Sequence, residues 1–471
     1  MAAAAERGAT QQPAAVGDVL GRARAALAAY ENRDQARVDE AVTALAWSIY
    51  KPENAKALAE LAVRDTGLGT VGSKITKNTR KTFGTLRDLL RVRTVGVIEE
   101  DPARGMVKYG KPVGVVAAVC PSTNPAATPV NKAMMALKGG NAVVIAPSPA
   151  GYETTAATVG LMRAELKKAG FPEDLVQILP APVSKEATQA LMAGADLAVV
   201  TGSQDNVRRA MASGTVAIGV GAGNVPVIID SSADLDDAAQ KIAASKIFDN
   251  ATSCSSENAL VILEPVYEAA VAALSEAGGY RASAAERDSI QAALWQGGKL
   301  NRRLIAKDAA VLAREVGLAP AAHEARFFMV EEAQVARPFA DEKLSLVLTL
   351  YRARDLSDAK RIVAEILAIK GRGHSVGIHT RDPEHARELA RDLDVVRVLV
   401  NQAHAFGNGG SFDNGLEFTL SMGCGTWGGN SISENLSWRH FVNITHLVTT
   451  IPEDRPSEEA LFGPYWQRYG R

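Results

Sequence analysis

The hydrophobic pattern divides the first quarter of the chain into helix-like and strand-like stretches. Over residues 18–65, apolar positions recur at spacings of three and four, which is typical of amphipathic helices. Short β-like runs follow over residues 93–110, with a turn signal at 101–105 between them. Residues 1–16 are rich in alanine and show no such periodicity. The pattern predicts a flexible N-terminal tail, a helical layer and then a β-hairpin.

Farther along, continuous apolar runs alternate with helical segments in two series. The runs lie at residues 113–119, 142–146, 175–179, 197–201 and 215–218 in the first series, and at 259–263, 345–351, 375–379 and 396–400 in the second. Because buried strands that alternate with helices build parallel sheets covered on both faces, we expect an α/β fold with two such domains. We place these domains at residues 17–230 and 231–430. A C-terminal segment over 431–471 contributes one further strand near 441–450.

The composition is that of a folded globular protein with little net charge. Of the 471 residues, 47% are hydrophobic and 22% are charged, and the formal net charge is −1. So small a charge gives no general attraction to nucleic acids or to anionic membranes, and any anionic ligand must be held by local groups. No apolar run approaches the roughly 20 residues needed to cross a membrane. We therefore expect neither nucleic acid nor membrane as a partner.

Three cysteines are too few, and too far apart, for a disulfide framework. Cys120, Cys254 and Cys424 show no metal-type spacing, and no secretory segment begins the sequence. These features predict a cytoplasmic protein without a metal site. Cys254 lies among small polar residues between a predicted helix and a predicted strand, whereas a structural cysteine usually has apolar neighbours. The residues leave its role open between a nucleophile and a structural thiol.

A glycine cluster at residues 219–223, Gly-Val-Gly-Ala-Gly, differs in context from a dinucleotide-binding fingerprint. The fingerprint opens a helix, whereas here another strand follows. The cluster therefore joins strand to strand. It serves either as a tight crossing between domains or as a place where a ligand approaches the backbone closely.

Asn124 lies in a loop that directly follows the first strand of the first series. Pro121 and Pro125 restrict the backbone on either side of it and so fix the direction of its amide. The amide can donate to a developing oxyanion. Alternatively, it can form an Asx-turn that caps the next helix. The residues alone leave both interpretations open.

An ordered set of stretches resembles the aldehyde dehydrogenase superfamily, and specifically its CoA-acylating branch. Each stretch is weak alone, but together they follow the family order between about residues 16 and 448. They are CPSTNP (120–125), TGS (201–203), GVGAGNVP (219–226), CSSE (254–257), EKLS (342–345) and SMGCGTWGGNS (421–431). The resemblance implies a Rossmann-like cofactor domain over 17–230 and a catalytic domain over 231–430. It also implies that the hairpin and the late strand form an arm that joins subunits into a homodimer or homotetramer.

The same resemblance implies roles for single residues. Cys254 matches the family nucleophile, and Asn124 matches the asparagine that holds the oxyanion together with the Cys254 backbone N–H. Glu342 matches the glutamate that bonds to the nicotinamide ribose. His374, in a glycine-rich loop, is either close to CoA or the thioester, or is a loop-packing histidine. The residues that match positions around the NAD or NADP cofactor are Ser122, Thr123, Pro147, Ser148, Thr201, Gly202, Ser203, Val220, Gly221, Gly223 and Glu342.

Two departures from the family pattern bear on the chemistry. Val220 stands where hydrolytic members carry the glutamate that activates water, and a valine cannot act as a general base. The acyl-enzyme would then persist until the thiol of CoA arrives, because a thiol is a far better nucleophile than water at neutral pH. Ala146 stands where many hydrolytic members carry a lysine that contacts the adenosine ribose. That departure leaves both NAD and NADP open.

Two further stretches, AWSIYKP (46–52) and GSFDNG (410–415), are most similar to acylating sulfoacetaldehyde dehydrogenases. They imply that a small anionic aldehyde is oxidised to its thioester, with CoA as co-substrate. The alternatives are acetaldehyde or propionaldehyde as substrate, with or without a bacterial microcompartment; a hydrolytic dehydrogenase; and a catalytically silent structural homologue. A sulfonate would need a cation or a cluster of N–H donors, and the sequence does not reveal which group supplies it.

Overall fold

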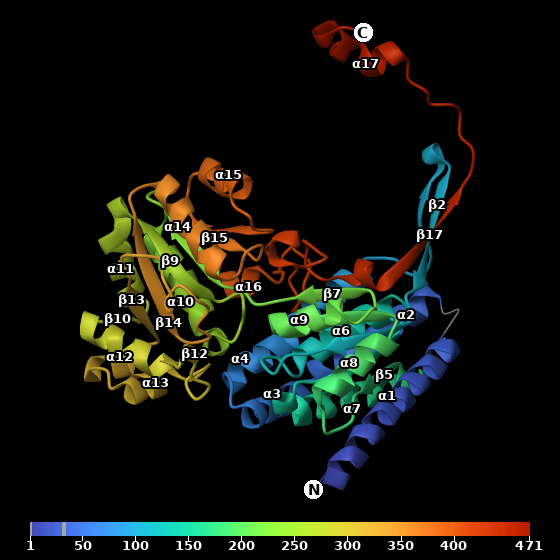
Figure 1. Cartoon of the computed structure of the whole chain (residues 1–471), viewed down its shortest axis with the longest axis horizontal. Helices are drawn as coiled ribbons and strands as arrows, with labels where there is room; N and C mark the ends of the chain where they lie inside the picture. The colour runs from blue at the N-terminus through green and yellow to red at the C-terminus, as the bar shows by residue number, and fades with distance from the viewer. Residues whose placement is uncertain (1, 31–33) are drawn as a thin grey trace.

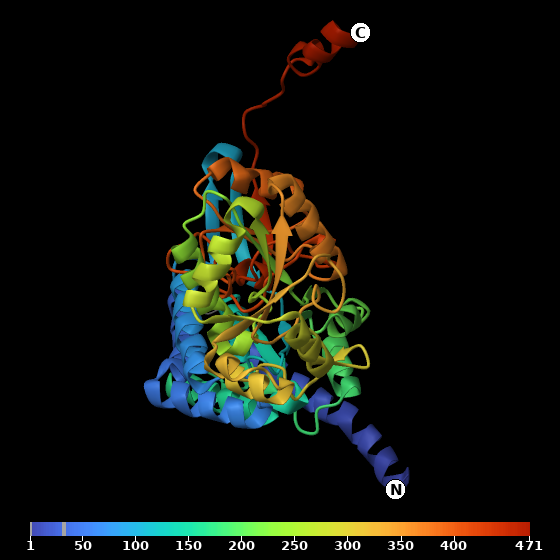
Figure 2. The same cartoon turned by 90° about the vertical axis from the view of Figure 1, so that its left-hand side faces the viewer.

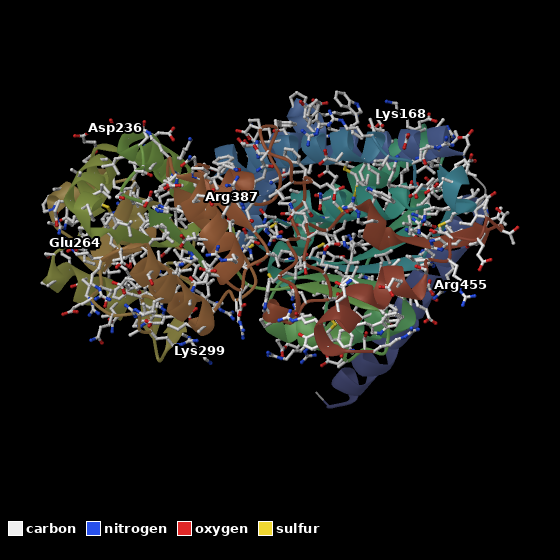
Figure 3. All side chains as sticks on the ribbon, turned by 90° about the horizontal axis from the view of Figure 1, so that it is seen from above. Lys168, Asp236, Glu264, Lys299, Arg387 and Arg455 are labelled. Atoms are coloured by element: carbon white, nitrogen blue, oxygen red, sulfur yellow. The ribbon has the colours of Figure 1, made fainter. Side chains whose placement is uncertain are left out.

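The computed structural model describes residues 2–30 and 34–471, with side chains in the first helix from residue 15 onward. Two lobes lie side by side, each built on a parallel sheet, and a narrow β-arm extends from one of them (Figures 1 and 2). The expected α/β fold with two sheet-based domains is therefore present. Charged side chains such as Lys168, Asp236 and Glu264 point outward from the lobes (Figure 3).

The first lobe contains a five-stranded parallel sheet in the order β5-β4-β3-β6-β7. Its strands are β3 (Val115–Val119), β4 (Ala142–Ala146), β5 (Val176–Ile178), β6 (Leu197–Thr201) and β7 (Ala217–Val220). Every residue of β3 and β4 is buried and apolar, because both faces of the sheet are covered. One layer contains α6 (Ala127–Lys138) and α7 (Tyr152–Lys168) with α2 (Gln35–Tyr50) packed on them. A second layer contains α1 (Ala2–Tyr30), α8 (Lys185–Gly194) and α9 (Gln204–Met211).

Helix α1 corrects the expectation of a flexible tail over residues 1–16, because this helix begins at Ala2. Residues 2–5 are all alanine, the residue with the highest helix propensity, so they extend the helix without an apolar face of their own. From Val16 onward, the helix buries Val19, Ala23 and Tyr30 in the core of the first lobe.

A helical rod lies at the junction of the two lobes. After α3 (Pro52–Thr66), the segments α4 (Val71–Thr76), η1 (Lys77–Lys81) and α5 (Thr82–Leu90) follow one another without a break. The middle segment is a π-helix, a form that often marks functional sites. Helix α4 contacts the second lobe, so the rod can hold residues of both lobes in register.

The second lobe contains a seven-stranded parallel sheet in the order β10-β13-β14-β9-β8-β15-β16. Its strands are β8 (Val225–Ile229), β9 (Glu257–Leu263), β10 (Gly279–Arg281), β13 (Phe327–Glu331), β14 (Val347–Ala353), β15 (Val376–His379) and β16 (Val398–Val400). One face packs with α10 (Leu235–Ile247), α11 (Tyr267–Glu276), α12 (Ala284–Leu294) and α13 (Ala309–Val316), and the other with α14 (Leu356–Ile369) and α15 (Pro383–Asp392). Short elements nearby are β11 (Trp295–Gln296), β12 (Lys299–Leu300) and α16 (His404–Gly407).

The glycine cluster joins β7 of the first sheet to β8 of the second, which is the predicted strand-to-strand crossing. Strand β8 pairs with β9 and β15. The change of domain therefore falls within the cluster, before residue 225, and not at the predicted boundary after 230. The difference arises because β8, although it follows the first series in sequence, finds its hydrogen-bonding partners in the second sheet.

The arm consists of β1 (Gly96–Asp101), β2 (Met106–Pro112) and β17 (Val442–Val448), which pair in that order and are antiparallel. The structure thus contains the expected hairpin and late strand. Helix α17 (Glu458–Tyr469), which the sequence pattern did not predict, stands apart from both lobes at the end of the chain (Figures 1 and 2). In the part of the chain that the structure describes, the helices are too short or too polar to span a membrane.

Candidate active site

The strand order of the five-stranded sheet reverses between β3 and β6, and this reversal places a crevice at the carboxyl ends of these strands. Two adjoining cavities, an outer one of about 390 Å³ and an inner one of about 460 Å³, open at this edge. Both are lined by Pro121 from the loop after β3 and by residues 201–203 from the loop after β6. The cavities are therefore parts of one groove that runs from the first lobe to the junction of the lobes.

The outer cavity collects residues that the sequence assigned to the cofactor. Its lining includes Ser122, Pro147, Ser148, Thr201, Gly202 and Ser203. Helix α9 begins after Ser203, whose hydroxyl accepts a hydrogen bond from the Asn206 amide at 3.3 Å. Lys185 and Arg209 also line this cavity. Hydroxyls, two cations and a helix N-terminus are the donors that phosphates prefer, so the groove fits the pyrophosphate of NAD or NADP.

The inner cavity contains Cys254, and both lobes contribute to it. Cys254 follows η5 (Phe248–Ala251), precedes β9 and is partly exposed. Burial of the thiol and the nearby Glu342 carboxyl raise the pKa of Cys254 to about 12. Glu342 lines the same cavity and pairs with Lys370, whose Nζ lies 3.0 Å from its Oε2. At neutral pH these surroundings favour the protonated thiol of Cys254 over its thiolate.

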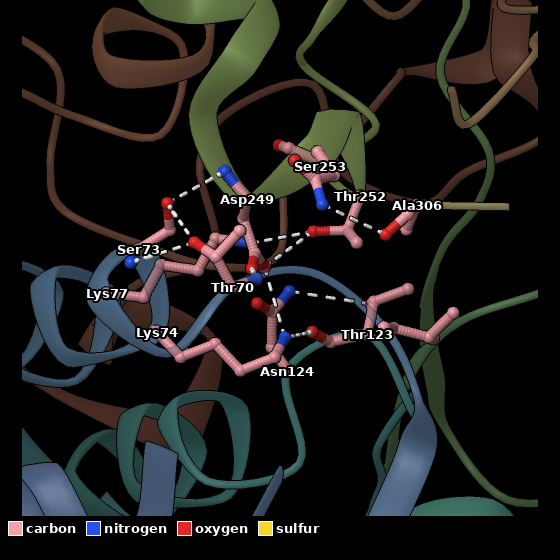
Figure 4. Close-up of polar contacts among 12 residues, drawn as sticks. Thr70, Ser73, Lys74, Lys77, Thr123, Asn124, Asp249, Thr252, Ser253 and Ala306 are labelled. Atoms are coloured by element: carbon pink, nitrogen blue, oxygen red, sulfur yellow. Dashed lines mark hydrogen bonds and ion pairs between the residues drawn. The ribbon is translucent and has the colours of Figure 1, made fainter. Parts of the chain in front are cut away.

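The Asn124 side chain is not committed to the helix that follows it. Its Oδ1 accepts no hydrogen bond from any residue that the structure describes, and α6 has Ala126 at its N-cap without a side-chain cap. Its Nδ2 lies 3.5 Å from Thr123 Oγ1, which is a weak contact (Figure 4). The Asx-turn is therefore absent, and the amide is free to donate into the inner cavity that it lines.

Two predicted cofactor residues, Val220 and Gly223, lie outside both cavities. Val220 is 3% exposed and packs in the core of the first lobe. Gly221 and Ala222 line the inner cavity instead. Gly223 packs behind the nucleophile, where a Cβ would lie 2.1 Å from the Cys254 carbonyl oxygen. The sequence could not show which residues of the cluster line the cavity, because the direction in which each one points depends on where β7 ends.

His374 also lies away from the cavities. Its side chain is buried, and Nδ1 is 2.8 Å from the Ser375 hydroxyl. Burial lowers the pKa of His374 well below its usual range, so the ring is neutral. Its Nε2 finds no hydrogen-bond partner among the described residues and would lie 3.0 Å from a Cβ at position 223. This geometry favours the loop-packing interpretation over contact with CoA.

A buried ion network, absent from the sequence predictions, links the two loops that carry Asn124 and Cys254 (Figure 4). Asp249 Oδ2 accepts from Lys77 Nζ at 2.6 Å and from Lys74 Nζ at 3.1 Å. Lys74 also donates to the Thr123 carbonyl at 3.1 Å, and Lys77 donates to Thr252 Oγ1 at 2.9 Å. Both loops are thus tied to the helical rod at the lobe junction.

Asp249 also begins a strained turn. Residues 249–251 have φ values of 51°, 52° and 59°, the left-handed region that residues with a Cβ avoid. Burial alone would raise the pKa of Asp249, but the charges of Lys77 and Lys74 outweigh it and hold that pKa below its usual range. The carboxylate therefore stays ionised and holds the turn that leads to Cys254.

The comparisons with known proteins agree with this geometry. A model of the aldehyde dehydrogenase family matches residues 5–288. The chain is 54% identical over 460 residues to a sulfoacetaldehyde dehydrogenase (acylating) of Cupriavidus necator, which covers 97% of this chain and 93% of that protein. It is 36% identical to a succinate-semialdehyde dehydrogenase (acetylating) of Clostridium kluyveri, over 95% of this chain and 98% of that one. The crystal structure of an acetylating aldehyde dehydrogenase from Geobacillus thermoglucosidasius aligns with a TM-score of 0.91 at 33% identity, covering 95% of this chain and 99% of that one. The chain therefore belongs to the aldehyde dehydrogenase family, in its CoA-acylating branch.

Proposed function

We propose that this chain oxidises sulfoacetaldehyde to sulfoacetyl-CoA, with NAD or NADP as the hydride acceptor and CoA as the acyl acceptor. The observation that carries the proposal is the convergence of Cys254, the weakly engaged Asn124 amide and Glu342 in one cavity, which continues into the phosphate-binding groove. The similarity to the Cupriavidus protein supports this aldehyde. The Clostridium relative is named for succinate semialdehyde, another aldehyde that carries an anionic group.

Cys254 carries the acyl group between the two half-reactions. After the thiol has lost its proton to water, the thiolate adds to the aldehyde carbon. The resulting oxyanion accepts hydrogen bonds from Asn124 Nδ2 and from the Cys254 backbone N–H, which donates to no other backbone group in the described part of the chain. When bound, the nicotinamide supplies a hydride acceptor and a positive charge that favours the thiolate. As the oxyanion re-forms its carbonyl, the carbon loses its hydrogen as hydride and a thioester to Cys254 remains. The CoA thiol then attacks that thioester, the bond to the Cys254 sulfur breaks, and the departing Cys254 sulfur takes up the proton that CoA loses, which releases acyl-CoA and restores the Cys254 thiol.

The site offers no free carboxylate for hydrolysis of the thioester. Among the described residues that line the inner cavity, Glu342 is the one carboxylate, and Lys370 engages it. Gly221 and Ala222, the residues of the glycine cluster in this lining, carry no ionisable side chain. Because a general base contributes about 10²–10⁴-fold to such a step, water should compete poorly with the thiol of CoA.

The purified protein should reduce NAD or NADP steadily with sulfoacetaldehyde only when CoA is present. Without CoA, we expect at most one reduced cofactor per chain in an initial burst and then a rate at least about 100-fold lower, because no free carboxylate activates water. Absorbance at 340 nm measures both phases. Sustained sulfoacetate formation without CoA would contradict thiolysis. A higher kcat/KM for acetaldehyde or propionaldehyde than for sulfoacetaldehyde would contradict the proposed substrate.

We further propose that the β-arm and helix α17 join copies of this chain. Strand β17 lies at the edge of the arm and exposes Ile444, Leu447 and Val448 by 45%, 51% and 63%. Helix α17 exposes further large apolar residues, among them Leu461 and Phe462. An apolar sheet edge and an apolar helix face both require a partner. Light scattering should therefore give the mass of two or four chains, and the mass of a single chain at micromolar concentration would contradict this proposal.

A further inference from the structure

One charged residue that lines the inner cavity, Lys81, takes no part in the mechanism described above. Lys81, the last residue of the π-helix, is buried and lines the same cavity as Cys254. Its Nζ donates to the carbonyl oxygens of Gly409 and Gly410 at 2.7 and 3.3 Å. Both partners are neutral. The Phe418 ring, whose centroid lies 5.3 Å from Nζ, adds only a cation–π contact, so no anionic group among the described partners balances the charge of the ammonium.

Three other lysines near this site already have an anionic partner, and Arg397, a buried cation with neutral acceptors, is not among the described residues that line the cavity. Lys370, the second basic residue among the described lining of the inner cavity, pairs with Glu342. Lys74 and Lys77 share Asp249. Among the described residues that line the inner cavity, the two lysines thus face a single carboxylate, Glu342. The inner cavity has a local surplus of positive charge even though the whole chain has almost none.

The neighbouring residue Arg80 supplies no negative charge to Lys81. Arg80 points elsewhere and donates to the Ser411 hydroxyl at 2.7 Å. Burial, followed by the charges of Arg80 and Lys77, lowers the pKa of Lys81 to about 7, and the nearby Cys254 opposes that shift. An anion bound beside Nζ would supply the missing countercharge and favour the charged ammonium.

The loop that holds Lys81 is built around this contact. A Cβ at Gly409 would lie 2.9 Å from Lys81 Nζ and 2.6 Å from the Thr419 carbonyl oxygen, so only glycine lets the loop approach the ammonium this closely. Gly410 has a φ of +83°, which also favours glycine. Gly410 opens the GSFDNG stretch (410–415) that resembles acylating sulfoacetaldehyde dehydrogenases. The sequence feature that pointed to an anionic aldehyde therefore contacts the unpaired cation.

We propose that Lys81 binds the anionic group of the aldehyde while Cys254 attacks its carbonyl, so that aldehydes bearing a sulfonate or carboxylate are selected over neutral ones. The inference rests on the acylating oxidation proposed above and names the residue that selects its substrate. A charge-assisted hydrogen bond of this kind affects binding by at least about tenfold.

The test compares kcat/KM for sulfoacetaldehyde and for acetaldehyde at saturating CoA and cofactor. In Lys81→Met, which keeps the length of the side chain but removes its charge, the ratio of the two should fall at least about tenfold, chiefly through the KM of sulfoacetaldehyde. Lys81→Arg should restore most of the ratio. Lys132→Met is the matched control, because Lys132 is also a buried ammonium held by carbonyls, at 2.7 and 2.9 Å, but lies in the first lobe. Its ratio should not change.

Equal losses on both aldehydes in Lys81→Met would overturn the inference, because Lys81 would then merely hold the 409–410 loop. An unchanged ratio would overturn it as well. A second measurement needs only the wild-type protein with NAD bound, which favours the Cys254 thiolate: ethanesulfonate, an unreactive anion of the substrate's size, should slow alkylation of Cys254 by iodoacetamide at pH 7, whereas neutral dimethyl sulfone should not. Equal effects of the two compounds would refute anion binding. If ethanesulfonate protects Cys254 but sulfoacetaldehyde is not turned over, the proposed substrate fails while the anion site stands.

Discussion

Replacing Cys254 by alanine should lower CoA-dependent aldehyde oxidation by at least about 10⁴-fold, since removal of a covalent nucleophile typically costs this much or more. Neither the adduct that delivers hydride nor the thioester that CoA attacks can form without the sulfur. Asn124 and the cofactor groove remain in place, but they only stabilise an oxyanion that no longer arises. The effect should appear in kcat, because binding of aldehyde and cofactor uses other residues.

The measurement pairs steady-state rates with a test that the variant is folded. Cys254 is partly exposed, so Cys254→Ala should unfold within a few degrees of the wild type and still bind reduced cofactor, as followed by its fluorescence. Cys424→Ala is the matched control: this thiol is buried near Cys254 but lies outside both cavities, and the variant should keep most of the activity. Residual activity of Cys254→Ala above about one per cent would exclude the covalent mechanism.

The sequence predicted the strands of the sheets better than it predicted which single residues line the cavities. Strands β3 and β4 are buried on both faces, so each reads as an unbroken apolar run, and a run of this kind can be recognised without any tertiary information. Val220 is the last residue of β7, whereas Gly221 and Gly223 follow the strand. The resemblance placed Val220, Gly221 and Gly223 beside the cofactor, but only contacts with the rest of the fold decide which of them line a cavity.

The lysines of the helical rod were missed for a different reason. Lys74, Lys77 and Lys81 recur at spacings of three and four, and lysines at helical spacing usually indicate a solvated face. Their partners, Asp249 and the 409–410 loop, lie more than 170 residues away in the sequence. A charge becomes informative only when its burial is known, and burial here depends on how the two lobes meet.

Replacing Asp249 by asparagine should lower the free energy of unfolding by about 3–5 kcal/mol, because it leaves two buried ammonium groups without a carboxylate. Asparagine has nearly the same shape, so the loss reports charge and not packing. Lys77→Met in the same chain should recover part of the loss, since one buried cation then remains instead of two. Asp237→Asn, which breaks an exposed ion pair with Lys241, should cost at most about 1 kcal/mol. Urea unfolding at pH 7 measures all four proteins.

The advantage of the wild type over Asp249→Asn should also depend on pH. Because the pKa of Asp249 is lower in the folded than in the unfolded chain, the stability it contributes is fully present above the unfolded value of about 4 and is lost as the pH falls through the folded value. The difference between the two proteins should therefore be constant between pH 5.5 and 7 and should shrink only below pH 4. A difference that grew as the pH fell below 4 would mean that Asp249 is protonated in the folded protein.

Asp249 touches no reacting atom, so its effect on activity must pass through the loops that it positions. At a temperature where Asp249→Asn is fully folded, we expect kcat to fall at least about tenfold with little change in the KM for CoA, because a small displacement of Asn124 relative to Cys254 weakens attack and oxyanion binding together. A folded variant with the kcat of the wild type would show that the network only stabilises the lobe junction. If Asp249→Asn lowers kcat but Lys77→Met alone does not, then the positioning depends on Lys74 and its hydrogen bond to the Thr123 carbonyl, in which Lys77 takes no part.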